Sequence, residues 1–192
     1  MTTAVLADHI PLRIDLGART RTAALVVGGA LLTAAAAQLV FRLPWTPVPV
    51  TGQTFAVLVV GGALGWQRGA ASMALYMMLG AAGLPFYAGG ERGWEAATGA
   101  TAGYLVGFVV AAAAVGHLAQ RGQDRRFETS VPAMLAGMAI IYVFGVSWLA
   151  IHLSVDSATA LELGLVPFVI GDAIKLAVAG LLMPVAWRLA ER

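Results

Sequence analysis

Six apolar segments, almost free of charged residues, constrain the fold of this chain more than any other feature. They cover approximately residues 22–41, 54–65, 69–84, 99–119, 131–153 and 165–187. Four of them are long enough to cross a ~30 Å hydrocarbon core as helices that rise ~1.5 Å per residue. Only 11% of all residues are charged, against about 25% in soluble domains, so too little polar surface exists to coat a water-soluble globule. The sequence therefore predicts an all-α integral membrane protein.

The second and third apolar segments are each marginal as a membrane span. The sequence "GWQRG" at 65–69 separates them, and together they are typical of a tight helical hairpin. Counting them separately gives a bundle of six transmembrane helices.

The basic residues indicate how this bundle is oriented. With six spans and a cytoplasmic N-terminus, nine arginines fall on the cytoplasmic side and two, Arg42 and Arg92, fall outside. The nine are Arg13, Arg19, Arg21, Arg68, Arg121, Arg125, Arg126, Arg188 and Arg192. This asymmetry follows the positive-inside rule and predicts that both termini are cytoplasmic.

The N-terminal region, residues 1–19, is expected to form a cytoplasmic tail, and residues 20–192 a single membrane domain. The tail lacks the continuous apolar core of a cleaved signal peptide. The chain has no Cys, and its three His residues show no metal-ligand spacing. No phosphate-binding glycine-lysine loop and no paired catalytic carboxylates are evident. We therefore expect no enzymatic activity, no metal or cofactor, and no nucleic-acid partner.

The last apolar segment contains two charges in the stretch "PFVIGDAIKL" at 167–176. Asp172 and Lys175 are three residues apart, so they share one face of a helix. A lone charge at the bilayer centre costs about 2.5–3.5 kcal/mol on insertion scales. A structural ion pair is one interpretation, but buried ion pairs stabilise poorly. We favour a polar ligand site in a cavity open to the outside, and an ion or proton path is an alternative.

Two loops on the outer side contain residues typical of a small-molecule site. The loop 42–55 contains three prolines and apolar side chains beside polar ones, which fits either a turn at the membrane interface or a lid folded over the bundle. The loop 83–104 combines glycines with Phe86, Tyr87 and Trp94. It fits either a ligand pocket or an ordinary flexible loop.

Small residues recur at four-residue spacing in two of the apolar segments. Gly103, Gly107 and Ala111 form one series and Ala30 and Ala34 the other. Such spacing lets helices approach closely in lipid. We interpret the first series as packing within the bundle, and the second as either packing or a docking surface for another membrane subunit.

Four motifs together resemble the BioY family, the biotin-binding S components of energy-coupling-factor vitamin transporters. They are "PVPVTGQTFAVLVVGGALG" (47–65), "RGAASMALYMMLGAAGLPFYAGG" (68–90), "GYLVGF" (103–108) and "PFVIGDAIKL" (167–176). The resemblance implies six transmembrane helices in a bacterial cytoplasmic membrane and a biotin pocket near the outer face. It also implies a set of ligand contacts: Asp172, Lys175, Gln53, Tyr87, Arg92 and Tyr104. A transmembrane coupling protein and ATP-binding subunits are implied as partners of some members, while others work alone.

Biotin fits the charged pair chemically, because its ureido ring offers two N–H donors and one carbonyl acceptor. Asp172 is suited to accept from the ring and Lys175 to donate to it. Alternatively, Lys175 meets the valerate carboxylate. A different small vitamin and a proton- or ion-coupled transporter are the competing functional interpretations.

Overall fold

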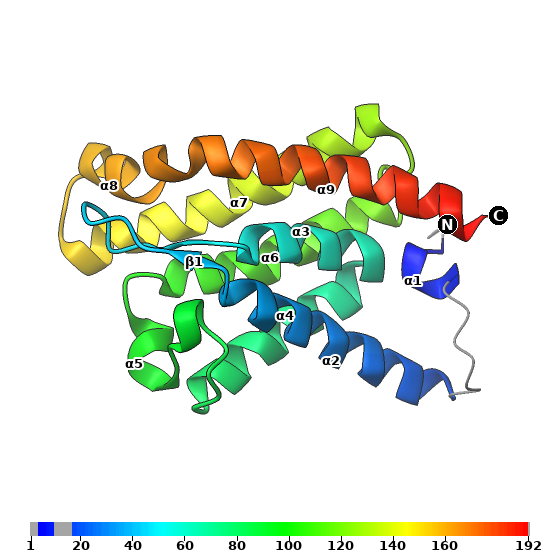
Figure 1. Ribbon diagram of the computed structural model, residues 1–192, viewed down its shortest axis with the longest axis horizontal. Helices are drawn as coiled ribbons and strands as arrows, with labels where there is room; N and C mark the ends of the chain where they lie inside the picture. Colours follow the sequence, from blue (N-terminus) through cyan, green and yellow to red (C-terminus); the bar gives the residue numbers. More distant parts are fainter. Residues whose placement is uncertain (1–3, 10–16, 192) are drawn as a thin grey trace.

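The computed structural model describes residues 4–9 and 17–191, and these form a bundle of helices (Figure 1). Each predicted apolar segment corresponds to one long helix. These helices are α2 (Ala18–Ala37), α3 (Gln53–Leu64), α4 (Trp66–Ala81), α6 (Ala102–Ala119), α7 (Phe127–Leu153) and α9 (Val169–Ala190). The expected limits differ from the observed ones by up to four residues. The chain leaves the first helix at residue 38 to begin a strand, which apolar composition alone does not reveal.

Among the described residues, four regions are long and apolar enough to cross a membrane: α2, α6, α7 and the region from Ser157 to Ala190 that contains α9. The predicted separation of α3 and α4 is correct. Gly65 lies between them with φ 81° and ψ 173°, a backbone conformation that favours glycine and turns the chain within one residue. The 12 residues of α3 span only ~18 Å, so this helix does not cross a ~30 Å core by itself.

Helix α6 lies in the interior and packs against α7, α4 and α3. Gly103 and Gly107 permit its close approach to α7. A Cβ at Gly103 would overlap the side chain of Trp148 and the carbonyl oxygen of Phe144, and one at Gly107 would lie 3.1 Å from the Cα of Ile141. The predicted packing role of these glycines is therefore confirmed.

The small residues of α2 face the bundle rather than a free surface. Ala30 and Ala34 are 1% and 7% exposed, on the face that packs against α4 and α3. The prediction that these two alanines form a docking surface is wrong for this conformation, because the chain's own helices cover them. A partner that meets α2 would contact the opposite face, which exposes Ala24, Gly28 and Leu31.

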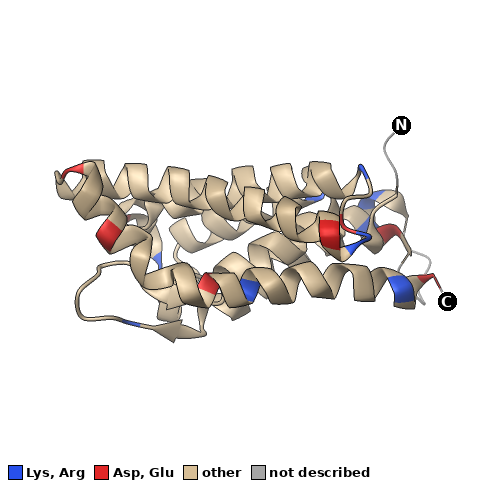
Figure 2. Cartoon of the chain, turned by 90° about the horizontal axis from the view of Figure 1, so that it is seen from above, with Lys and Arg blue, Asp and Glu red and all other residues tan. Residues whose placement is uncertain are grey.

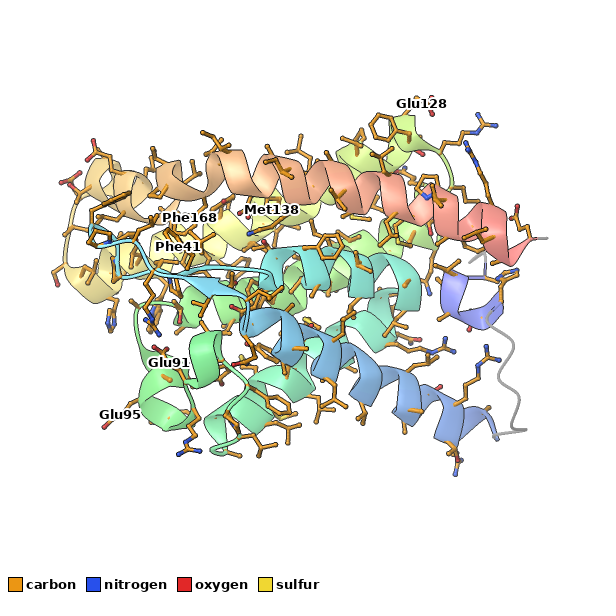
Figure 3. All side chains as sticks on the ribbon, in the orientation of Figure 1. Phe41, Glu91, Glu95, Glu128, Met138 and Phe168 are labelled. Atoms are coloured by element: carbon orange, nitrogen blue, oxygen red, sulfur yellow. The ribbon has the colours of Figure 1, made fainter. Side chains whose placement is uncertain are left out.

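Short elements close one end of the bundle. A two-stranded antiparallel hairpin, β1 (Val40–Phe41) and β2 (Val50–Thr51), follows α2 and was not predicted from the sequence. The 3-10 turn η1 (Ala88–Gly90) and α5 (Gly93–Thr98) connect α4 to α6. Helix α8 (Ser157–Gly164) and the 3-10 turn η2 (Val166–Phe168) connect α7 to α9. Glu91 and Glu95 lie at this end, and Glu128 lies at the other (Figure 3).

Both termini lie at the end opposite these short elements (Figure 1). Charged residues lie at both ends of the bundle, with Lys and Arg gathered mainly toward the termini, whereas most of the surface of the long helices is uncharged (Figure 2). The short helix α1 (Leu6–His9) packs here against α3 and α9, with Val5, Leu6 and Ala7 buried. Part of the predicted tail is therefore packed on the bundle, and residues 1–3 and 10–16 lie outside the described residues.

Arginines hold α1 in place. Arg68 forms an ion pair with Asp8 at 2.7 Å, and Arg21 donates to the carbonyl oxygen of Ala7 at 2.7 Å. Burial of Asp8 opposes its ionisation, but the hydrogen bonds from Arg68 and from the Val5 backbone N–H, together with the charges of Arg68 and Arg21, outweigh it, so the pKa of Asp8 is lowered. The rings of His9 and of Trp187 in α9 meet in an edge-to-face arrangement, with the ring centres 4.9 Å apart.

Candidate functional site

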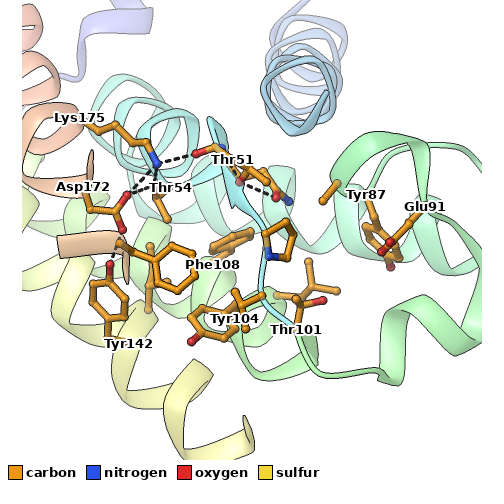
Figure 4. Close-up of a pocket in the computed structure, with 17 residues that line it drawn as sticks. Thr51, Thr54, Tyr87, Glu91, Thr101, Tyr104, Phe108, Tyr142, Asp172 and Lys175 are labelled. Carbon is orange, nitrogen blue, oxygen red and sulfur yellow. Dashed lines mark hydrogen bonds and ion pairs between the residues drawn. The ribbon is translucent and has the colours of Figure 1, made fainter. Parts of the chain in front are cut away.

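A pocket lies beneath the hairpin loop, among α3, α6, α7 and α9 (Figure 4). Its lining consists of Val48, Pro49, Thr51, Gln53, Thr54, Tyr87, Ala88, Glu91, Thr101, Tyr104, Leu105, Phe108, Ile141, Tyr142, Phe168, Asp172 and Lys175. The cavity that these residues enclose has a volume of about 50 Å³, well below the ~300–1,000 Å³ typical of small-molecule sites. The pocket is therefore narrow and nearly closed in this conformation.

Asp172 and Lys175 lie in the first two turns of α9 and form a direct ion pair, with Lys175 Nζ 2.8 Å from Asp172 Oδ1. Only 7% of the Asp172 side chain and 21% of the Lys175 side chain are exposed. The N-terminus of α9 favours the carboxylate, an effect of about 0.3–1 kcal/mol at exposed sites. The predicted pair is therefore real, and it faces the pocket as expected.

Further hydrogen bonds fix both charged groups. Thr54 of α3 donates to Asp172 Oδ1 at 3.1 Å, and the hydroxyl of Tyr142 in α7 donates to Asp172 Oδ2 at 2.5 Å. The ammonium group of Lys175 donates to the carbonyl oxygen of Thr51 at 2.6 Å. The pair thus ties α3, α7 and α9 together and anchors the base of the hairpin.

Gln53, at the start of α3, also reaches the pocket. Its amide nitrogen donates to the hydroxyl of Tyr76 at 2.5 Å, and its amide oxygen accepts from Thr51 Oγ1 at 2.8 Å. Gln53 is only 6% exposed. These bonds fix the orientation of the amide, so in this conformation Gln53 holds the end of β2 beside the pocket.

Tyr87 and Tyr104 contribute ring surface to the pocket, because their hydroxyls are engaged elsewhere. Tyr87 donates to the carbonyl oxygen of Met77 and Tyr104 to that of Gly164, each at 2.6 Å. Burial raises the pKa of Tyr87, which lies in the loop before α5, so its hydroxyl stays a neutral donor. Both predicted tyrosines therefore line the pocket with aromatic rings.

Arg92 does not line the pocket, contrary to the prediction. Its backbone is extended, with φ −163° and ψ 167°, and neighbouring residues in an extended segment point to opposite sides. Glu91 faces the pocket while the side chain of Arg92 is exposed. The sequence indicated the correct loop, but Glu91 rather than its neighbour Arg92 lines the pocket.

The hairpin loop covers the pocket and contacts both sides of it. Val48 is 6% exposed and Pro49 lies beside it in the lining, whereas Trp45 is 62% exposed. Thr46 Oγ1 donates to the carbonyl oxygen of Leu163 in α8 at 2.6 Å. Near the start of the loop, Arg42 forms an ion pair with Glu91 at 2.7 Å. This geometry is that of a lid, one of the two interpretations drawn from its composition.

Several site residues were missed from the sequence, above all Tyr142, Thr54 and Phe168. Thr54 and Thr51 are among the polar residues of the loop 42–55, but nothing in the sequence links them to a residue more than one hundred positions away. The signal available for Tyr142 was its polar hydroxyl within an otherwise apolar helix, because such a group needs a hydrogen-bond partner inside the bundle. In the part of the chain that the structure describes, no three His, Cys, Asp or Glu residues come together as metal ligands.

Comparisons with known proteins show which family this chain resembles. Residues 7–192 match the model of the BioY family. The chain is 39% identical over 140 residues to the "Biotin transporter BioY" of Thermotoga maritima, covering 73% of this chain and 81% of the relative. It is 36% identical over 147 residues to the "Biotin transporter BioY" of Rhizobium etli, covering 73% and 78%.

A solved structure shares the fold. It is the crystal structure of the "S-component for biotin from an ECF-type ABC transporter", which superposes with a TM-score of 0.75 over 92% of this chain and 96% of that one. At 23% identity this likeness speaks for the fold alone. The resemblance inferred from the four motifs is nevertheless confirmed by the family match, and the chain belongs to the BioY family.

Proposed function

We propose that this chain is the substrate-binding subunit of a biotin uptake system in the cytoplasmic membrane, and that biotin binds in the pocket between Asp172 and the hairpin loop. The names of its relatives support the choice of ligand. The single observation that carries the proposal is the buried pair of Asp172 and Lys175 in the wall of a pocket that the hairpin loop covers.

The hydrogen bonds of the pair determine what it can offer a ligand. A carboxylate has about four acceptor positions, and Thr54, Tyr142 and Lys175 occupy three of those on Asp172. Lys175 has three N–H donors, and its third contact, to Thr54 Oγ1, is weak at 3.4 Å. The pair therefore presents one free acceptor beside one exchangeable donor. This is the complement of an N–H and a carbonyl on one edge of a cyclic urea.

The rest of the pocket suits the apolar parts of biotin. Tyr104, Phe108 and Phe168 supply aromatic surface, and Leu105 and Ile141 supply aliphatic surface. Removing a fused ring and an aliphatic tail from water against such walls contributes affinity at roughly 25 cal/mol per Å² of apolar area. We propose that the hairpin loop opens to admit the ligand and closes over it.

The charges of the chain support a direction of transport. The end with both termini would face the cytoplasm, as the excess of arginines predicts, and the pocket would open outside. We propose six crossings, with α3 and α4 as a short hairpin that completes the bundle. A transmembrane coupling protein and ATP-binding subunits are the partners we propose to supply energy, because the chain lacks a phosphate-binding glycine-lysine loop.

Calorimetric titration of the detergent-purified chain tests the ligand. We expect saturable binding of biotin, weaker binding of dethiobiotin, and no binding of riboflavin or thiamine. The tail carboxylate and the ureido ring are common to biotin and dethiobiotin, so their comparison reports the contribution of the sulfur-containing ring. Binding of another vitamin in place of biotin would contradict the proposal while leaving the family assignment intact.

A further inference from the structure

Asp172 lies at the boundary between the ligand pocket and a second depression on the opposite side of α9. This depression is an apolar groove between α7, α8 and α9, lined by Leu135, Met138, Val146, Leu161 and Leu176 among others. The groove runs along helices long and apolar enough to cross a membrane, so in a bilayer it would face hydrocarbon chains. Asp172 and Tyr142 belong to the lining of both the groove and the ligand pocket.

The helix geometry explains this shared position. On α7, Ile141 lines the pocket and Met138 and Val146 line the groove, with Tyr142 at the boundary between the two faces. On α9, Lys175 lines the pocket and Leu176 the groove, again with Asp172 at the boundary. The hydrogen bond from the Tyr142 hydroxyl to Asp172 Oδ2 joins the two boundary positions. It thereby closes the wall between a polar site and a lipid-facing groove.

We propose that Tyr142 is a positioning residue for ligand recognition, which holds the Asp172 carboxylate toward the ligand and away from the groove. This inference rests on the proposed function. Thr54 and Lys175 both donate to Oδ1, so in the described chain Tyr142 is the donor that fixes Oδ2. Oδ2 also carries the remaining free acceptor position. Its direction therefore determines whether a ligand N–H finds an acceptor.

Removing the hydroxyl alone would leave Oδ2 without a partner beside an apolar surface. A buried carboxylate oxygen in that position needs another donor, and apart from the hydroxyls of Ser147 and Ser157, neither of which is hydrogen-bonded to Asp172, the other residues of the groove lining are apolar. The carboxylate would turn toward Lys175 or recruit water through the pocket. Either change removes the acceptor from the place where the ligand N–H requires it. The effect is confined to ligands that use this N–H.

The test compares Tyr142→Phe with Tyr104→Phe and with the unaltered chain. Tyr104 also lines the pocket, but its hydroxyl donates to Gly164, so it is a matched control for the loss of one phenolic oxygen. Each protein is titrated with biotin and with two analogues, each methylated at one ureido nitrogen. In the unaltered chain, the analogue that binds more weakly identifies the nitrogen that faces Asp172.

We expect Tyr142→Phe to weaken biotin binding by about ten- to one-hundredfold, the scale of a hydrogen bond to a charged group. The weaker analogue lacks the N–H in question, so its affinity should change by less than about threefold, within the usual context dependence of such effects. The ratio of the affinity for biotin to the affinity for the weaker analogue therefore falls in Tyr142→Phe and is preserved in Tyr104→Phe. An unchanged ratio in Tyr142→Phe, or an equal loss for both ligands, would overturn the inference.

Two further outcomes are distinct from these. If the unaltered chain binds no biotin, the proposed function fails and this inference fails with it, whereas a failure seen only in the variant leaves the proposed function standing. If Tyr142→Phe does not fold, it is combined with Asp172→Asn. Recovery of folded protein in the double variant supports a role exerted through the Asp172 charge, and no recovery would show a purely structural role.

Discussion

Removing one member of the Asp172–Lys175 pair should damage this protein more than removing both. In Lys175→Met, the Asp172 carboxylate loses its counter-charge while its side chain is only 7% exposed. Breaking a buried ion pair from one side typically costs about 3–5 kcal/mol. Thr54 and Tyr142 still donate to the carboxylate, so we expect a loss of about 2–3 kcal/mol in the free energy of unfolding, somewhat below that range.

The double variant Asp172→Leu, Lys175→Met removes both charges and fills their space with apolar atoms. Replacing a whole buried pair in this way is often neutral or stabilising by about 1–4 kcal/mol. Ligand binding should respond differently. Each lost hydrogen bond to a charged group is worth about 1.5–3 kcal/mol, so biotin affinity should fall at least about one hundredfold in the double variant.

The assay measures thermal unfolding in detergent and biotin titration for the single and double variants side by side. Ile170→Leu and Ile174→Leu are matched controls, because these residues lie in the same turns of α9 but are 79% and 62% exposed. We expect the controls to retain both properties. A double variant that binds biotin normally would refute the reasoning, and so would one that is less stable than Lys175→Met.

Three further predictions concern packing, the lid and pH. In thermal unfolding, Gly103→Val should destabilise the bundle by at least ~3 kcal/mol, because a Cβ at this position would overlap the α7 backbone and a tryptophan side chain. Gly28→Ala is the control: no atom lies within 4 Å of a Cβ at this position, so the variant should be neutral or slightly stabilising in the same assay. Arg42→Gln removes an exposed ion pair between the hairpin loop and Glu91, so the free energy of unfolding should change by less than about 1 kcal/mol. Because this ion pair holds the loop over the pocket, biotin dissociation measured by stopped flow should become faster and should no longer depend on salt concentration. Burial raises the pKa of Asp124, in the loop before α7, above its usual 3.8. The folded state then holds this proton more tightly than the unfolded state, so stability falls as the pH rises from 3.8 to the folded pKa. Asp124→Asn should therefore unfold at a higher temperature than the unaltered chain at neutral pH. This difference in unfolding temperature should vanish below about pH 4. Equal unfolding temperatures at neutral pH would contradict this prediction.

The long helices could be predicted from the sequence because lipid exposure requires continuous apolar runs. The division between α3 and α4 followed from the short polar stretch around Gly65, and the structure shows a positive φ there. The β1–β2 hairpin could not be predicted, since its strands are two residues each and depend on pairing across the loop. The burial of Ala30 and Ala34 likewise depends on which face of α2 meets α4.

The charged centre of the site could be predicted because ionised groups in an apolar helix require a reason. Asp172 and Lys175 carried that signal, since any helix brings residues three apart to one face. The hydrogen-bond partners of Asp172 carried no such signal in the sequence. Tyr142 is 30 residues from Asp172 and Thr54 is 118 residues away, and only the packing of α3 and α7 against α9 brings them together. Arg92 failed as a contact because the local backbone, rather than composition, decides which residue of the loop faces the pocket.

A crystal structure of the chain with bound biotin would show whether the charged pair recognises the ureido ring. We expect the ureido ring in the pocket, with one N–H directed at Asp172 and the carbonyl oxygen directed at Lys175, under a closed hairpin loop. Biotin bound elsewhere, such as in the groove between α7 and α9, with the hydrogen bonds of the charged pair unchanged, would contradict it.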